Sequence, residues 1–131
     1  MRNLNTLRVG INLVKEGQNP IEIRSNLSTS LIGVQASHKR DRVKASTVNQ
    51  LTNLVATSPL SDTYVYLKNV GDTNFDVRNA AADAGIIATL ASGEFMFFRL
   101  QKAKDLYVKN LSSSDVGEVE VSYWQAEQNA E

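Results

Sequence analysis

The chain has 131 residues and no cysteine, and its 14 Lys plus Arg balance 14 Asp plus Glu, so that the formal net charge is zero. This length suits one domain that buries roughly two thirds of the surface its unfolded chain exposes. The charge balance excludes a general attraction to nucleic acid or to an anionic membrane. The lack of cysteine excludes disulfides, thiolate metal sites and cysteine nucleophiles.

The N-terminal segments alternate apolar and polar residues, which is the two-residue period of a β-strand. Residues 6–14 (TLRVGINLV) predict a strand that ends at the turn cluster KEGQNP. IEIRSNL and SLIGVQAS repeat the alternation as further strand segments. The first 18 residues lack the apolar core of a signal peptide, and no window approaches the roughly 18 apolar residues of a membrane helix. We therefore expect a protein that stays inside the cell that makes it and has no membrane partner.

The middle of the chain has the weakest pattern. In KASTVNQLTNLVATSPLSD, the spacing of Val48, Leu51 and Leu54 suits a helical turn or two, whereas the Thr and Val content favours strand. We expect short helix or irregular structure here.

The strand pattern becomes clear again from residue 62. TYVYLKN predicts a strand with Val65 and Leu67 on one face and Tyr64 and Tyr66 on the other. The turn VGDT and the strand NFDVR follow, so this segment is predicted to form a hairpin. Further strands are expected over residues 85–91 and over GEFMFFRL, KDLYVKN and GEVEVSYW.

Two segments echo each other. YVYLKNVGDTNFDV and DLYVKNLSSSDVGEVEV share a strand, a Lys-Asn pair, a polar turn and a second strand, with Asn69 and Asn110 in corresponding positions. Asparagine at a strand exit tolerates left-handed backbone angles and hydrogen-bonds its own turn. The echo predicts two similar hairpins.

Together these elements predict an all-β fold, either an antiparallel β-sandwich or a jelly-roll-like barrel with eight to ten short strands. The long amphipathic helices that a parallel α/β fold requires are absent from the pattern. We expect a single β domain over residues 1–131, with an N-terminal arm at residues 1–5 and a flexible acidic tail at residues 126–131.

No segment carries a catalytic signature. The single histidine, His38, lies in a charged run, and the sequence has no Gly-x-Ser-x-Gly elbow. Glu118 and Glu120 share one face of a predicted strand, but a solvent-facing strand shows the same pattern. We therefore expect no enzymatic activity and no catalytic residue.

One segment partly matches a calcium loop. Asp72, Asn74 and Asp76 alternate as its first ligands do, and Asp83 falls at the twelfth position. The sixth position, where the tight turn needs glycine, is Val77. A hairpin turn in which Asp72 and Asn74 bond to the backbone is favoured, and we expect no metal and no cofactor.

The segment SHKRDRVK is the one local charge feature. If it is extended, His38, Arg40, Arg42 and Lys44 point the same way and form a cationic ridge. This ridge suits docking onto an acidic protein surface; the alternative is a solvated loop or an edge strand protected by its charges. Nucleic acid is disfavoured because no aromatic residues are interleaved with the charges.

The aromatic residues are the other candidates for partner binding. Phe95 and Phe97 alternate with Met96 and Phe98, so both faces of that strand are apolar and it should be central in its sheet or covered by a partner. Trp124 ends the last predicted strand and suits an interface anchor, a sugar platform or a plain core position.

Three segments of the latter half carry a family resemblance: YLKNVGDTNFDV, LASGEFMFFRL and LYVKNLSSSDVGEVEVSYW. Over residues 62–125 the chain resembles small virion proteins of tailed bacteriophages, of the decoration or cement type that coats the head. The likeness is one of strand and turn style and includes no diagnostic motif. It implies a β-sandwich or jelly-roll protein without enzymatic activity, and it transfers no site residue.

The leading hypothesis is therefore a non-enzymatic structural virion protein that binds and stabilises a bacteriophage capsid. Its expected partners are the major capsid protein or other virion proteins and further copies of itself, as a trimer or dimer, on the capsid surface after assembly in the host cytoplasm. One alternative is a subunit of the tail, neck or fibre. A second alternative is a carbohydrate-binding β-sandwich module, motivated by Tyr64, Tyr66, Tyr123 and Trp124.

Overall fold

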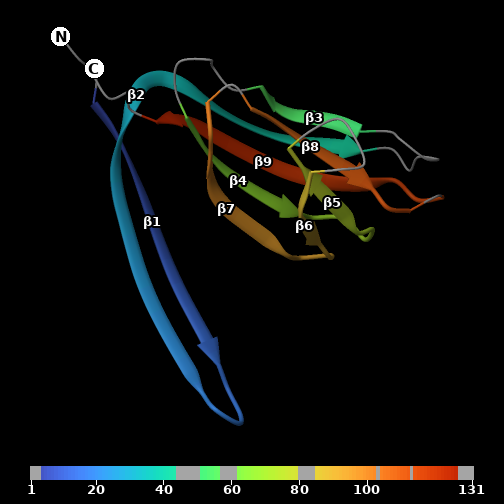
Figure 1. The fold of residues 1–131 in the computed structure, drawn as a ribbon, viewed down its shortest axis with the longest axis horizontal. Coiled ribbons are helices and arrows are strands. Elements are labelled where there is room, and N and C mark those ends of the chain that lie inside the picture. Colours follow the sequence, from blue (N-terminus) through green and yellow to red (C-terminus); the bar gives the residue numbers. More distant parts are fainter. Residues whose placement is uncertain are drawn as a thin grey trace. The chain divides into compact units, whose positions relative to one another are not determined.

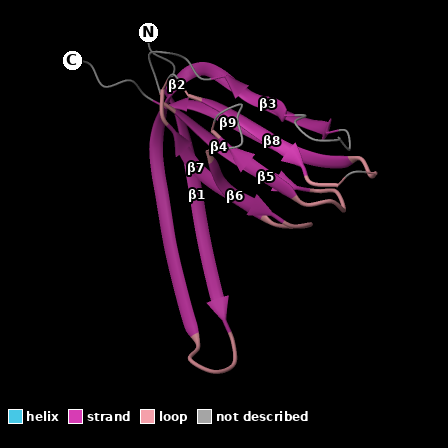
Figure 2. Cartoon of the chain, turned by 45° about the vertical axis from the view of Figure 1, so that its right-hand side comes forward, coloured by secondary structure: helices cyan, strands magenta, loops and turns pink. Residues whose placement is uncertain are grey.

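The computed structural model describes residues 4–43, 51–56, 62–79, 85–102, 104–112 and 114–126. Within these residues the chain forms nine strands and no helix (Figures 1 and 2). The strands are β1 (Leu4–Lys15), β2 (Ile21–Val43), β3 (Leu51–Ala56), β4 (Thr63–Asn69), β5 (Phe75–Arg78), β6 (Ile86–Leu90), β7 (Phe95–Leu100), β8 (Asp105–Asn110) and β9 (Gly117–Ala126). The predicted all-β class is confirmed.

The chain divides into two compact units, residues 1–34 and residues 35–131. The first unit contains β1 and the first part of β2, and the second contains the remaining strands. Of the predicted N-terminal arm and acidic tail, residues 1–3 and 127–131 lie outside the described residues.

The first unit is a two-stranded antiparallel hairpin, seen in Figure 1 as the long pair of blue strands. Its register runs without a break from Leu4↔Ile32 to Lys15↔Ile21. The predicted turn at KEGQNP is present, and Gly17 and Asn19 adopt positive φ angles of 95° and 53° there. The segments IEIRSNL and SLIGVQAS are parts of one continuous strand, and pairing with β1 runs through the Ser- and Thr-rich residues between them.

The second unit is a sandwich of two antiparallel sheets. One has the strand order β2-β9-β4-β7 and the other the order β3-β8-β5-β6. Eight strands in two such sheets, with most successive strands alternating between them, form a jelly roll. The predicted antiparallel sandwich is therefore confirmed, in its jelly-roll form.

The core lies between the two sheets and consists of the inward-facing residue of each alternating pair. Val65 and Leu67 of β4 and Val119 and Val121 of β9 contribute from one sheet, all with no exposed surface. The other sheet contributes Phe75, Val77, Leu90, Leu106 and Val108. The predicted division of β4, with its tyrosines on the opposite face from Val65 and Leu67, follows from the same alternation.

One prediction about a strand was wrong, and one of the two alternatives for another strand is excluded. The middle segment, predicted as short helix or irregular, contains the strand Leu51–Ala56 (β3), which pairs with β8 across a register shift between Asn53 and Val55. Pairing with a neighbouring strand overrides the weak local pattern there. The Phe95–Leu100 strand (β7) is at an edge of its sheet and is not central, so cover by a partner is the alternative that remains.

The two echoing segments are not hairpins, so the prediction of two similar hairpins was also wrong. β4 and β5 belong to different sheets, and so do β8 and β9. Each polar turn is therefore an arch that carries the chain from one sheet to the other. Residues 70–74 form the first arch, and the described residues 111–112 and 114–116 belong to the second.

Asn69 and Asn110 stabilise these arches in corresponding ways. Asn69 has no exposed surface; its Nδ2 donates to the carbonyl oxygens of Thr73 (2.6 Å) and Leu90 (3.0 Å), and its Oδ1 accepts from the Gly71 N–H (3.1 Å). Asn110, which is 1% exposed, donates to the Asp115 carbonyl (2.9 Å) and accepts from the N–H of residue 112 (2.9 Å). The predicted correspondence of the two asparagines thus has a structural basis, because each closes its own turn.

The first arch is bonded to β9 and to the second arch. The N–H groups of Val70 and Gly71 both donate to the Glu118 carbonyl of β9 at 3.0 Å, and the Leu111 N–H of the second arch donates to the Asn74 carbonyl at 2.9 Å. A Cβ atom at Gly71 would lie 2.7 Å from the Glu118 nitrogen. The backbones meet so closely that a side chain at residue 71 does not fit.

Candidate interaction surface

The outer face of the β9-β4-β7 part of the sheet carries a group of aromatic side chains, here named the aromatic face. Pairing places Tyr64 opposite both Trp124 of β9 and Arg99 of β7, and Tyr66 opposite Phe97. Residues directly opposite in neighbouring strands project to the same side of the sheet. The aromatic face consists of Tyr64, Tyr66, Phe95, Phe97 and Trp124.

The aromatic rings of β4 and β7 pack against each other in two pairs. The Tyr64 and Phe97 ring centroids lie 5.9 Å apart with an interplanar angle of 5°, and those of Tyr66 and Phe95 lie 6.2 Å apart at 38°. Tyr64 is only 7% exposed although it is on the outer face, whereas Phe95 is 64% exposed. The aromatic face is therefore closely packed around Tyr64 and exposed to solvent at Phe95.

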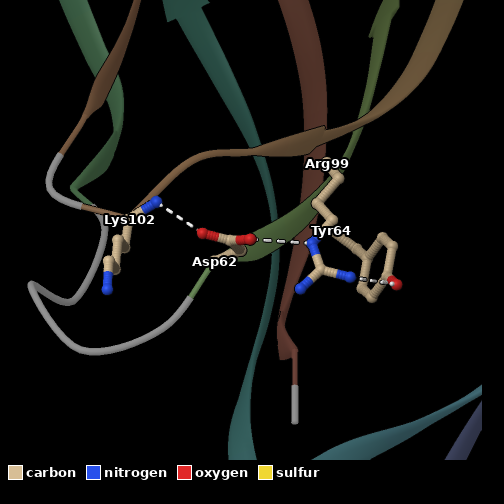
Figure 3. A network of polar contacts seen from close by, with 4 residues as sticks. All are labelled: Asp62, Tyr64, Arg99 and Lys102. Atoms are coloured by element: carbon tan, nitrogen blue, oxygen red, sulfur yellow. Dashed lines mark hydrogen bonds and ion pairs between the residues drawn. The ribbon is translucent and has the colours of Figure 1, made fainter. Parts of the chain in front are cut away.

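A polar network borders the aromatic face (Figure 3). The Arg99 Nε donates to Asp62 Oδ2 (2.8 Å), and its Nη1 donates to the Tyr64 hydroxyl (3.2 Å). The Arg99 guanidinium carbon also lies 5.4 Å from the Tyr64 ring centroid, a cation–π distance. Asp62 Oδ1 accepts from the Lys102 backbone N–H (2.7 Å). The network fixes the start of β4 against the end of β7.

These contacts shift both ionisable groups toward their charged forms. The Lys102 N–H and, next, the Arg99 guanidinium lower the pKa of Asp62 below its ordinary value. The hydrogen bond to Asp62 is the main cause that raises the pKa of Arg99. The two groups are a charged pair at neutral pH, with no shift toward a proton-transfer role.

Three of the predicted partner-binding residues lie together on the aromatic face. Phe95 and Phe97 project outward from β7, while Met96 and Phe98 pack against the core. Trp124 is half-buried beside Tyr64, on the face opposite the core residues Val119 and Val121.

The predicted cationic ridge is only partly within the described structure. His38, Arg40 and Arg42 lie in β2, so the extended backbone that the prediction required is present. Their side chains, and the whole of Lys44, lie outside the described residues. The ridge stays a prediction.

The acidic segment that partly matches a calcium loop is divided between an arch and a strand. Asp76 lies in β5, where its carboxylate forms an ion pair with Arg78 (3.3 Å) and accepts from the Thr89 hydroxyl (3.2 Å). Val77 is fully buried in the core, and Asp83 lies outside the described residues. Among the residues that the structure describes, no three His, Asp or Glu side chains are grouped as a metal site.

One surface was not among the predicted sites. On the β1–β2 hairpin, the register places seven aliphatic residues on one face, here named the hairpin face. They are Leu7, Val9, Ile11, Leu13, Ile21, Ile23 and Leu27. The same face also carries Lys15, Ser25 and Thr29. The opposite face carries Arg8, Asn12, Glu22 and Arg24, of which Glu22 and Arg24 form an ion pair at 2.8 Å, and also Val14, which is 54% exposed. The alternation of these residues is visible in the sequence, but alternation alone also fits a strand buried in a core.

The hairpin face is exposed. Ile11, Leu13 and Ile23 are each 50% exposed, Ile21 is 47% and Leu27 is 40% exposed. Contiguous apolar surface of this kind is uncommon on monomeric soluble proteins unless it binds something.

No protein-family model and no curated protein matches the chain. Among solved structures, the chain is similar to one from Bacillus, reported under the heading "Bacillus endospore appendages form a novel family of disulfide-linked pili". The similarity covers 72% of this chain and 93% of that one, with 16% sequence identity and a TM-score of 0.36. It is too low to support an argument about function. The described residues include no helix that is long and apolar enough to cross a membrane.

Proposed function

We propose that this protein is a non-enzymatic structural subunit that binds and stabilises a bacteriophage capsid, as decoration or cement proteins do. The observation that carries the proposal is the exposed apolar surface on regular strands: the hairpin face, and Phe95 at the edge of the aromatic face. Such surfaces suit permanent contacts between proteins, whose interface cores are apolar and rich in aromatic residues.

The jelly roll is compatible with this proposal and does not prove it, because one fold serves many functions. Viral capsid proteins and lectins both use it. The resemblance of residues 62–125 to small tailed-phage virion proteins favours the capsid. The predicted ridge of His38, Arg40, Arg42 and Lys44 would add a charged contact to the apolar ones.

The test is the number of copies of this chain per purified virus particle, measured by quantitative mass spectrometry against the major capsid protein. A ratio of one per capsid chain, or one per three, supports decoration. About a dozen copies would instead indicate the tail or neck alternative, since those parts are rings of low copy number. The absence of the chain from particles would overturn the virion proposal.

The carbohydrate-binding alternative depends on how the aromatic face is exposed. A sugar platform needs several accessible rings beside polar groups, whereas Tyr64 is 7% exposed and Trp124 is half-buried. The low exposure of these two rings argues against a sugar platform here. A blank glycan array combined with a blue-shifted Trp124 emission would count against sugar binding.

A further inference from the structure

The edge of β1 that faces away from β2, here named the β1 edge, differs from the other sheet edges. In the strand orders of the described residues, β1, β7, β3 and β6 are the end strands. β7, β3 and β6 have six, six and five residues, and register shifts interrupt the pairing of β3 and β6. Short or irregular edge strands resist pairing with other chains. β1 has 12 residues, and its pairing with β2 has no shift.

The β1 edge has few features that prevent another strand from adding to it. The strand contains no proline, and its charged residues are Arg8 and Lys15. Residues 10–15 are all exposed. In an antiparallel pair, alternate residues direct their N–H and C=O groups to the same neighbour, so about half of the residues of β1 direct theirs away from β2. A long, regular and exposed edge of this kind is a site for strand addition.

The hairpin also has fewer strands than a stable sheet needs. A two-stranded hairpin is marginally stable in water, and independent stability requires about three or more strands with an apolar face, or packing against another element. On the hairpin face, Ile11, Leu13 and Ile23 are each 50% exposed. Burial of these residues therefore contributes little to stability, and a strand added at the β1 edge supplies further backbone pairing.

We propose that the β1 edge pairs with the β1 edge of a second copy, antiparallel, about a two-fold axis normal to the sheet. The contact is isologous, because the same residues of both copies form it. The two hairpins become one four-stranded sheet, and the axis keeps both hairpin faces on the same side. The inference rests on the proposed structural role, since it leaves the joined hairpin faces open to a virion partner.

The sequence of β1 fits a second copy, because it is complementary to itself in one register. When Gly10 lies opposite the partner's Gly10, each aliphatic residue of β1 on the hairpin face meets another aliphatic residue, and each charged residue meets an asparagine. The pairs are Leu7 with Leu13, Val9 with Ile11, Arg8 with Asn12 and Lys15 with Asn5. No like charges are opposite each other, and such matched cross-strand pairs stabilise a sheet.

Other registers match less well. A pair centred on Val9 places Leu13 opposite Asn5. A pair centred on Ile11 places Leu7 opposite Lys15. A shift by a single residue is excluded, because it joins the hairpin face of one copy to the polar face of the other.

The experiment is disulfide cross-linking, which suits a chain without cysteine. Arg8→Cys and Asn12→Cys are made in separate full chains and mixed in equal amounts under mild oxidation. In the proposed register the two positions are directly opposite, with Cα atoms about 4.5–5.5 Å apart, which is within reach of a disulfide. Leu7→Cys mixed with Leu13→Cys tests the other face of the sheet in the same way. Far-UV circular dichroism checks that each variant is folded.

The matched control is Arg8→Cys mixed with Val14→Cys. Arg8 and Val14 are exposed and lie on the same face as Asn12. Val14 is two residues beyond Asn12, about 7 Å along the strand, and is therefore out of disulfide reach of the partner's residue 8. Each variant alone is a second control, because the same position in the partner is at least about 14 Å away along the strand.

The expected result is covalent dimer from both opposite pairs, at least about tenfold more than from the control mixture or from any single variant. Cross-links on both faces require the two β1 strands to lie side by side, because stacked sheets bring only one face of each together.

Three results would each overturn the inference. They are no dimer from the opposite pairs, as much dimer from the control mixture, and cross-links on one face only. The first of these leaves the β1 edge to a strand of another protein. The outcome is separable from the fate of the proposed function. Dimers of a chain that is absent from virus particles refute only the virion role, and a chain that is abundant on particles but gives no dimer refutes only the edge pairing.

Discussion

Replacing Asn69 with alanine tests whether the first arch is the structural element described above. The change removes the bonds to the Thr73 and Leu90 carbonyls and the bond from the Gly71 N–H. A buried hydrogen bond contributes about 0.5–1.5 kcal/mol net. Three such bonds therefore predict a loss of about 3 kcal/mol in the free energy of unfolding, a large part of the roughly 5–15 kcal/mol typical of a domain. Urea denaturation at one protein concentration, followed by Trp124 fluorescence and circular dichroism, measures it.

The matched control is Asn74→Ala in the same arch. Asn74 is exposed, and the bond that it accepts from the Leu111 N–H uses its backbone oxygen, which the substitution retains. Its expected loss is within about 0.5 kcal/mol. The reasoning is refuted if Asn69→Ala costs less than about 1 kcal/mol, or if the two variants are equally destabilised.

Three further predictions follow. Asp62→Asn should lower the free energy of unfolding by about 1 kcal/mol or less at pH 6, since its ion pair is partly solvent-exposed. Because the pKa of Asp62 is lowered in the folded state, its carboxylate contributes to the free energy of unfolding above the ordinary pKa of 3.8. This contribution disappears as the pH falls through the folded-state pKa. Urea denaturation should therefore show a smaller difference between Asp62→Asn and the wild type at pH 3 than at pH 6. Gly117→Ala should lower the melting temperature strongly in calorimetry, because the new Cβ collides with the Phe75 ring; an unchanged melting temperature would contradict that packing. Arg40→Glu with Arg42→Glu should weaken co-sedimentation with capsids at fixed salt, and unchanged binding would remove the ridge from the proposal.

The strands were predictable where apolar and polar residues alternate regularly, both in the core strands and in the exposed β1–β2 hairpin. Val65 and Leu67 alternate with Tyr64 and Tyr66, and that period exists only because one face of β4 meets the opposite sheet. β3 was missed because its short segment lacks a regular alternation. Local residues determine whether a segment can form a strand. Where the local pattern is weak, pairing with neighbouring strands determines whether the segment does form one.

The arches and the sheet edges were not predictable from the sequence. A polar turn after Asn69 or Asn110 suits a hairpin and an arch equally, because its residues fix the local backbone and not the sheet to which the next strand belongs. The apolar character of both faces of β7 likewise fits a central strand and an edge strand with a partner. The aromatic residues were identified as candidates, but their grouping required the register that places Tyr64 opposite Trp124.

The position of β9 has a consequence for how the molecule folds. This strand, Gly117–Ala126, lies between β2 and β4, which are far earlier in the chain. Contacts between residues so distant in sequence carry a large loop-closure entropy and slow the folding of β-sandwiches. Until β9 is inserted, the facing edges of β2 and β4 have unpaired backbone groups and are able to pair with other chains. We therefore expect the insertion of β9 to be the slow step of folding, and the period of aggregation risk to end with it.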